Sequence, residues 1–290
     1  MQKYGRRLMG ALRNPANVFT ALVLVIFALT PIVAPALDES FYVIVFARIM
    51  IWGIAAVSVN LIMGYGGLIS FGHAVYLGIG GYTVGILAFH GVTSAWIQWP
   101  VAIGLSGLVA LIFGAISLRT KGVYFIMITL ALAQMIFFLS VSAERYGSDD
   151  GLSILARSDF GVSGFSLNDK TTMYYTIFAF LLASVFVSWR LVQSRFGTVI
   201  RAAKSNDPRV QSIGVAAYRY RLTAFVIAGM MCGIAGLLQA NLESFVSPDM
   251  MNWQRSGELI FMVVLGGMST LFGPVTGAFV FLMLSEILAG

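Results

Sequence analysis

Apolar residues recur along the chain in runs of about twenty, the length that an α-helix needs to cross the hydrocarbon core of a membrane. Short polar or glycine-rich segments separate the runs. We predict spans over residues 18–37, 41–63, 73–90, 95–117, 123–142, 171–190 and 222–240, followed by a last apolar region at 258–289. The pattern therefore predicts an all-α polytopic membrane protein of about eight transmembrane segments, folded as one permease-sized domain over 1–290.

Glycine-rich stretches interrupt this pattern at 64–72 and again inside 258–289. An unbroken helix over 258–289 would be about 48 Å long, which exceeds a hydrocarbon core of about 30 Å. We therefore expect broken or re-entrant helices at both places, because non-helical backbone is tolerated at membrane depth against protein or a water-filled cavity. The candidates for breaking a helix or lining a pathway are Gly66, Gly67, His73, Gly266 and Gly267. For His73 we favour a hydrogen-bonded structural role.

The 18 Lys and Arg residues are distributed unevenly among the polar segments. With the N-terminus inside, thirteen of them lie on the cytoplasmic side, whereas the outer loops hold four of them and ten of the twelve acids. This asymmetry follows the positive-inside rule. It predicts a cytoplasmic N-terminus (1–17), outer loops at 143–170 and 241–257, and a cytoplasmic loop at 194–221. Nucleic-acid binding is not indicated, because the bases flank spans.

The N-terminal segment combines four bases with an apolar run, as a signal peptide does. The apolar stretch from Val18 to Ala36 is longer than a signal-peptide core. We therefore interpret it as an uncleaved first span, with a cleaved signal peptide as the alternative.

The basic loop contains the signals of a short helix. Asn206-Asp207-Pro208 supplies a capping side chain followed by a proline that tolerates the first turn, and Gly214 ends the turn as a left-handed C-cap. We expect Val210 and Ile213 to face outward near the end of this helix. Such a helix is suited to binding by a soluble protein on the cytoplasmic side.

Enzymatic chemistry finds no support in the sequence. The chain lacks a G-x-x-x-x-G-K-[ST] motif, and its two histidines, His73 and His90, have no second ligand at metal spacing. Cys232 is the single cysteine, so no disulfide forms within the chain. We interpret Arg48 as snorkelling to the interface, and we expect interhelical hydrogen bonds from Asn60, Gln134 and Gln239.

Four blocks of the sequence resemble one family, the M-type permeases of branched-chain amino acid ABC importers. They are NLIMGYGGLISFGHAVYLGIGGYTVGIL (60–87), TKGVYFIMITLALAQMIFF (120–138), RFGTVIRAAKSNDPRVQSIGVAAYRYRLTAFVIAG (195–229) and FVSPDMMNWQRSGELIFMVVLGGMSTLFGPVTGA (245–278). Together they cover most of 41–285. The segment from Asn206 to Val215 matches the helix that, in this family, couples the permease to its ATPase.

The resemblance implies a multi-pass subunit of the bacterial inner membrane that forms half of a translocation pathway. It implies a second, H-type permease, two cytoplasmic ATPases that hold ATP and Mg²⁺, and a periplasmic binding protein as partners, with no cofactor on this chain. Permeases of urea and short-chain amide importers have similar sequences, so those solutes stay open. A membrane receptor or scaffold is the alternative from another class. Relatives continue with a further helix and a basic tail, so this sequence represents a shorter variant or part of a longer protein.

Overall fold

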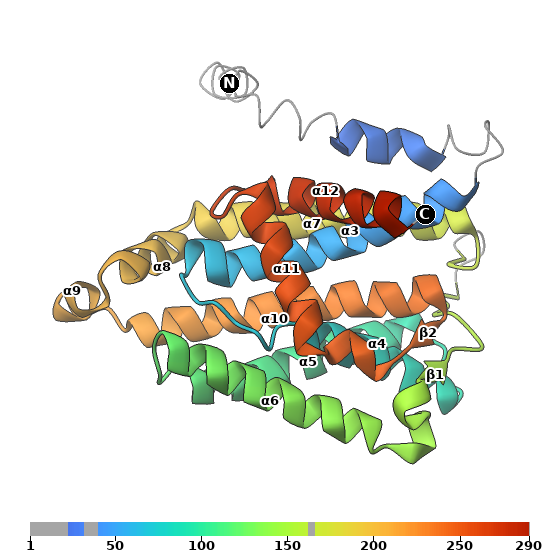
Figure 1. Cartoon of the computed structure of the whole chain (residues 1–290), viewed down its shortest axis with the longest axis horizontal. Coiled ribbons are helices and arrows are strands. Elements are labelled where there is room, and N and C mark those ends of the chain that lie inside the picture. The colour runs from blue at the N-terminus through green and yellow to red at the C-terminus, as the bar shows by residue number, and fades with distance from the viewer. Residues whose placement is uncertain (1–22, 32–39, 162–165, 290) are drawn as a thin grey trace.

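The computed structural model describes residues 23–31, 40–161 and 166–289, which are helical for most of their length (Figure 1). Residues 23–31 form a helix. The remaining helices are α3 (Ser40–Asn60), α4 (Ala74–Phe89), α5 (Ala95–Ser117), α6 (Val123–Val141), α7 (Lys170–Val192), α8 (Arg195–Ser205), α9 (Asp207–Ser212), α10 (Ala217–Glu243), α11 (Trp253–Gly266) and α12 (Gly273–Ala289). A π-helical turn, η1 (Leu61–Tyr65), extends α3. Short 3-10 turns are η2 (Glu144–Tyr146), η3 (Ser148–Asp150) and η4 (Pro248–Met251), and the strands are β1 (Leu152–Ser153) and β2 (Phe245–Val246).

Five helical segments are long and apolar enough to cross a membrane: 41–65, 95–117, 123–141, 170–192 and 217–243. Helices α4 and α12 are apolar but shorter. These segments coincide with six of the predicted spans and with half of the last apolar region, so the all-α polytopic fold is confirmed. The predicted first span and the N-terminal segment 1–17 lie mainly outside the described residues, and the number of crossings stays a prediction.

Helix α10 forms the centre of the bundle and packs against α3, α4 and α5 (Figure 1). Small residues allow its close approach to these neighbours. A Cβ at Gly236 would overlap the Leu77 carbonyl oxygen of α4, and a Cβ at Gly233 would overlap the Ser106 side chain of α5. Because helices in lipid associate through packing of small residues, this glycine series fixes the core of the fold. Gly80 of α4 lies equally close to the Gly233 carbonyl, as expected of a close-packing face.

The loops gather at the two ends of the bundle. At one end β1 pairs with β2 in antiparallel register, Leu152 opposite Val246, which joins the two predicted outer loops. At the other end Lys121, which follows α5, forms an ion pair with Asp207 of α9. The structure therefore separates the predicted outer loops from the predicted cytoplasmic loops. Which end faces the cytoplasm stays a prediction.

Both expected helix interruptions are present. After η1 the backbone is non-helical through residue 70 and turns into α4 only at residue 74, and Figure 1 shows this segment running back into the bundle. The last apolar region is not one helix but two, α11 and α12, which pack against each other and are joined by a non-helical segment at 267–272. We refer to residues 66–72 as the first break and to residues 267–272 as the second break.

The central packing predicts opposite effects for one substitution at two helical glycines. Gly236→Ala should lower the midpoint of thermal unfolding in detergent, because overpacking a tight contact costs about 1–3 kcal/mol. Gly104→Ala in α5 is the matched control. Its Cβ meets no neighbour, so the higher helix propensity of alanine, worth about 1 kcal/mol, should leave the midpoint unchanged or raise it. Equal midpoints for both variants would contradict the proposed role of the α10 glycines.

Candidate functional site: a helix pair, two helix breaks and an outer cavity

Helix α9 begins where the sequence predicts. The Asn206 side chain accepts a hydrogen bond from the backbone N–H of Arg209 at 3.0 Å, as an N-cap does, and Pro208 lies in the first turn. Gly214 follows the helix with a φ of +81°, the left-handed conformation expected of a C-terminal cap. Both ends of this short helix are thus capped by residues of the same loop. It packs against α8, and we refer to α8 and α9 together as the helix pair.

Asp207 fixes this helix pair to the bundle. Its Oδ2 lies 2.8 Å from Lys121 Nζ and 3.3 Å from Arg221 Nη1, and Arg221 also donates to the Ala203 carbonyl of α8 at 2.8 Å. Burial raises the pKa of the Asp207 carboxyl group, but the hydrogen bond from Lys121 and the charge of Arg221 outweigh it and lower the pKa overall. The carboxylate therefore stays ionised at neutral pH, and it loses these contacts only when acid protonates it.

The expectation that Val210 and Ile213 both face outward is wrong for Val210. Its side chain is 6% exposed and packs with Ala203 of α8 and Ala217 of α10. Ile213 is 73% exposed. The two residues differ because α9 ends at Ser212, so Ile213 is the C-cap residue and leaves the helical face that Val210 shares with the bundle. Only Ile213 is available to a partner.

The second break is joined to η1, the turn that leads into the first break, at one backbone carbonyl. The Gly64 oxygen of η1 accepts a hydrogen bond from Ser269 Oγ at 2.6 Å and another from Lys204 Nζ at 2.6 Å. Asn60 completes the junction, since its Nδ2 donates to the Thr270 carbonyl at 2.8 Å and its Oδ1 accepts from the Ser269 N–H at 3.0 Å. Lys204 of the helix pair therefore shares one acceptor with the second break.

Glycine at position 67 makes room for that lysine. Gly67 has a φ of +71°, and a Cβ there would lie 2.9 Å from Lys204 Cγ. Gly267 has a φ of +101°, which starts the second break. Gly66 and Gly266 do not adopt left-handed conformations; they lie close to the Ile62 and Gly273 carbonyls, respectively.

His73 is fully buried, and its Nε2 forms a hydrogen bond with Ser58 Oγ at 2.9 Å. This is the structural arrangement favoured by the sequence. The cavity described next is lined by none of the residues predicted to break a helix or line a pathway, which are Gly66, Gly67, His73, Gly266 and Gly267.

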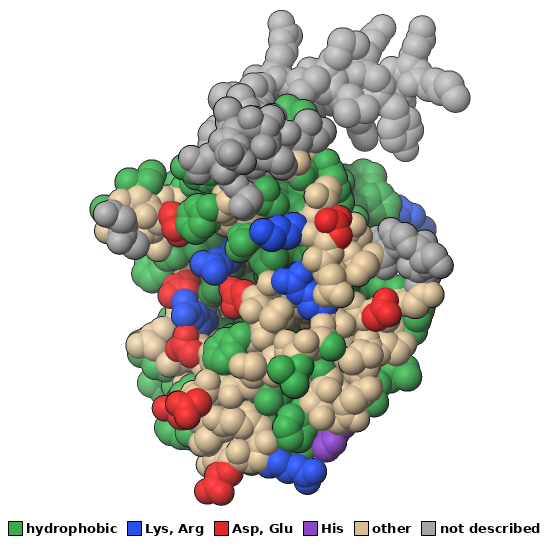
Figure 2. Space-filling model, turned by 90° about the vertical axis from the view of Figure 1, so that its right-hand side faces the viewer, with side chains coloured by type: hydrophobic (Ala, Val, Ile, Leu, Met, Phe, Trp, Pro, Cys, Tyr) green, Lys and Arg blue, Asp and Glu red, His purple; other side chains and the backbone are tan. Residues whose placement is uncertain are grey.

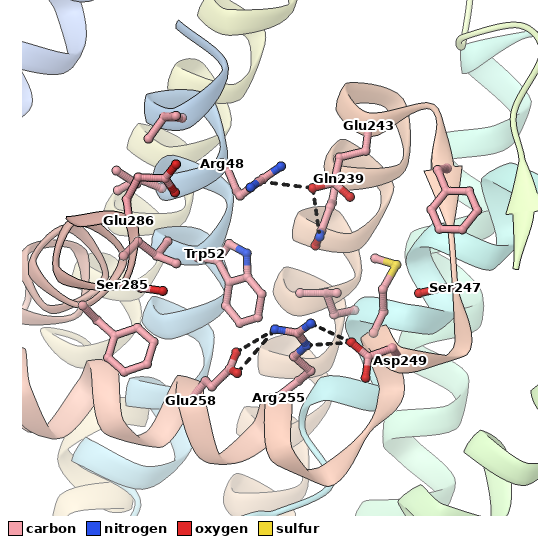
Figure 3. A pocket seen from close by; sticks show the side chains of 17 residues that line it. Arg48, Trp52, Gln239, Glu243, Ser247, Asp249, Arg255, Glu258, Ser285 and Glu286 are labelled. Carbon is pink, nitrogen blue, oxygen red and sulfur yellow. Dashed lines mark hydrogen bonds and ion pairs between the residues drawn. The ribbon is translucent and has the colours of Figure 1, made fainter. Parts of the chain in front are cut away.

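A cavity of about 450 Å³ opens between α3, α10, α11 and α12 at the end that carries the β1–β2 pair. Figure 3 shows polar side chains pointing into it from all four helices. Arg48 Nε lies 3.3 Å from Glu243 Oε1 on one side. On the other side Arg255 binds Asp249 at 2.6 Å and Glu258 at 3.2 Å, with its guanidinium 5.8 Å from the Trp52 ring. Lys, Arg, Asp and Glu side chains are interspersed over this end of the molecule (Figure 2).

The cavity corrects two interpretations of polar residues in spans. Arg48 does not only snorkel, because it is paired with Glu243 of α10. Gln239 does not bond between helices; its Nε2 donates at 3.4 Å to Glu243, four residues further along the same helix. Asn60 does connect two segments, as expected. Gln134 Nε2 is buried and meets no acceptor within the part of the chain that the structure describes.

Sequence reasoning missed the cavity and the role of Lys204. The available signal for the cavity was the unusual placement of Arg48 inside an otherwise apolar run. Ionisable residues in such places mark functional sites more often than the simple snorkelling explanation suggests. Among the described residues no group of three His, Cys, Asp or Glu side chains could hold a metal ion.

Comparisons with known proteins agree on a single family. The family model described as "Branched-chain amino acid transport system / permease component" matches residues 41–290. The high-affinity branched-chain amino acid transport system permease protein LivM of Escherichia coli (strain K12) is 26% identical over 261 residues, which cover 82% of this chain and 61% of the relative. LivM of Salmonella typhimurium is 26% identical with the same coverage.

A further relative carries a different substrate in its name. The autoinducer 2 import system permease protein LsrC of Escherichia coli O9:H4 is 26% identical over 213 residues, which cover 71% of this chain and 53% of the relative. The chain spans 61% of the length of the LivM proteins that it matches. No solved structure shows significant similarity to the chain.

The junction at Gly64 predicts a local effect of removing the lysine charge. Lys204→Met keeps the aliphatic stem over Gly67 but deletes the donor to the Gly64 carbonyl. Hydrogen bonds from charged groups contribute about 1.5–3 kcal/mol, so amide hydrogen exchange in both breaks should accelerate at least roughly tenfold. Arg195→Met, an exposed site in the same helix pair, is the control and should leave exchange unchanged. Equal exchange in the two variants would mean that Lys204 does not hold the breaks.

Proposed function

The chain belongs to the family of branched-chain amino acid transport permease components, and from this premise we propose that it forms half of the translocation pathway of an ATP-driven importer. The observation that carries the proposal is the family match over 41–290, because this range contains the helix pair, both breaks and the cavity. The relatives are named as transport permeases, so we infer that this chain is a transport subunit and not an enzyme.

The proposed partners follow from the residues left exposed. A basic loop that exposes Ile213 suits a groove on a cytoplasmic ATPase, and two such ATPases would bind ATP and Mg²⁺. A second, H-type permease would complete the pathway across the bilayer. A periplasmic binding protein would deliver the solute to the end with the β1–β2 pair. The proposed location is the bacterial inner membrane, with a cytoplasmic N-terminus.

Branched-chain amino acids are the favoured solutes. The LivM relatives cover more of this chain than LsrC does, at the same identity. Autoinducer 2, named for the LsrC relative, is the second candidate, and urea or short-chain amides remain a third. An import assay with these solutes separates the three possibilities.

We infer that movement of the ATPases reaches the membrane interior through the helix pair. Asp207 and Arg221 bind the pair to α10, and Lys204 connects it to the Gly64 carbonyl that Ser269 also contacts. A displacement of α8 would therefore act on both breaks at once. The long, flexible lysine stem allows such a displacement without breaking the bundle.

Ile213→Asp should uncouple the importer. A buried interface anchor contributes about 2 kcal/mol or more, and an aspartate would place an unpaired charge in the groove. In proteoliposomes that contain the complete complex, uptake of L-leucine driven by ATP should fall at least tenfold, with normal abundance of the permease. Thr198→Asp adds the same charge at an exposed position of α8 and should retain uptake. Wild-type uptake by Ile213→Asp would refute the coupling role. Absence of ATP-driven leucine uptake by the wild-type complex would refute the proposed substrate.

Orientation is tested by thiol labelling. Ser153→Cys in β1 and Ser205→Cys in α8 place single reporters at exposed positions on opposite ends of the bundle, in a Cys232→Ala background. An impermeant reagent added to intact spheroplasts should label residue 153 and spare residue 205, because the basic loop is retained on the cytoplasmic side. After permeabilisation both should react. Labelling of residue 205 in intact cells would invert the proposed topology.

A further inference from the structure

We propose that the outer cavity is a binding site for the zwitterionic head group of an α-amino acid, with Arg48 binding the carboxylate and Glu243 the ammonium. The proposal rests on the proposed function and deepens it, because it places substrate recognition on this chain in addition to the binding protein. The cavity lies at the end to which the solute would be delivered, and its volume of about 450 Å³ is within the usual range of ligand sites, about 300–1,000 Å³.

The two arginines of the cavity differ in their free hydrogen-bonding capacity. Arg255 uses all three of its guanidinium nitrogens, since Nε and Nη2 contact Asp249 and Nη1 contacts both oxygens of Glu258. Arg48 uses only Nε, in the ion pair with Glu243. Its terminal nitrogens have no partner among the described residues, and its side chain is 46% exposed. Arg48 is therefore the available donor for a carboxylate.

Glu243 offers the complementary acceptor. Its Oε1 receives both Arg48 Nε and Gln239 Nε2, which hold the carboxylate in one orientation. Its Oε2 has no hydrogen-bond partner within the described part of the chain and is free for an ammonium group. The free guanidinium nitrogens and the free carboxylate oxygen belong to one ion pair, so they lie side by side, as the two charges of an amino acid do.

The rest of the cavity selects against other ligands. Arg48 and Arg255 face four acids, Glu243, Asp249, Glu258 and Glu286, so a ligand with net negative charge would be repelled. The apolar wall includes Trp52 and Leu77, which are 5% and 2% exposed, and also Ile49 and Leu282. An aliphatic side chain packs against this wall while the head group reaches the ion pair. The arrangement favours a neutral zwitterion with an apolar side chain.

The experiment measures equilibrium binding of radiolabelled L-leucine to the complete, nucleotide-free complex in nanodiscs, without binding protein. L-Leucine should bind and be displaced by unlabelled L-leucine. Isopentylamine, which lacks the carboxylate, and 4-methylpentanoate, which lacks the ammonium, should compete at least tenfold more weakly. Arg48→Met and Glu243→Gln should each weaken binding at least tenfold. Arg145→Met and Glu144→Gln, exposed in the 143–170 loop at the same end, are the matched controls and should bind as wild type.

Conservative variants keep the test valid if the first pair perturbs folding. Arg48→Lys and Glu243→Asp retain the charges, should elute as monodisperse complexes, and should recover part of the binding. The site is refuted if the wild-type complex imports L-leucine with its binding protein but does not bind L-leucine in the absence of that protein. It is also refuted if Arg48→Met and Glu243→Gln bind L-leucine as the wild type does. A third refuting result is that L-lysine displaces radiolabelled L-leucine better than unlabelled L-leucine does. Failure of import by the wild-type complex would refute the proposed function, whereas L-leucine binding that depends on Arg48 and Glu243 would still support the site.

Discussion

Backbone that leaves the helical form inside an apolar bundle must find hydrogen-bond partners within the protein, and Asn60 at the end of α3 meets this requirement for the second break. Its amide donates to the Thr270 carbonyl and accepts from the Ser269 N–H. Ser269, although not a glycine, is held at a φ of +63°, a conformation that L residues rarely adopt. Two hydrogen bonds hold it in that geometry, one from its N–H to Asn60 and one from its Oγ to the Gly64 carbonyl. The second break is therefore fastened to the end of α3 and to η1, the segment that leads into the first break.

Helix α10 gives this structure its frame. It has 27 residues, about 40 Å at the usual rise, and runs from the helix pair to the cavity. Arg221 in its first turns binds Asp207, whereas Gln239 and Glu243 in its last turns form one wall of the cavity. Glycines between these ends hold α4 and α5 at close range. The helix-pair contact and the cavity thus share a single, tightly packed helix, which lets a displacement at one end of α10 be transmitted to the other end.

The parts predicted from sequence are those that depend on local physics. Span length and glycine content predicted the apolar helices and both breaks, and Asn206 with Pro208 predicted the start of α9, because a cap acts on residues next to it in sequence. The contact between Lys204 and Gly64 joins residues 140 positions apart, and no local pattern encodes it. Val210 was misjudged because a helix of six residues has no face that sequence alone can assign to solvent or to the bundle.

Charges in this chain fall into two physical classes, and the sequence supports different predictions from each. Exposed bases in the loops act collectively through their number, so their distribution alone predicts orientation. Arg48, Asp207 and Arg221 act individually, since each is held in a specific ion pair: Arg48 with Glu243, and Asp207 with both Lys121 and Arg221. Asp207 is the single acid of the basic loop, and it is also the one charge there that two bases hold against the bundle. An isolated charge of opposite sign within a loop or an apolar run therefore indicates a specific contact. The ion pairs formed by Asp207 and by Glu243 lie at the two ends of the molecule, where we propose that it meets its partners and its solute.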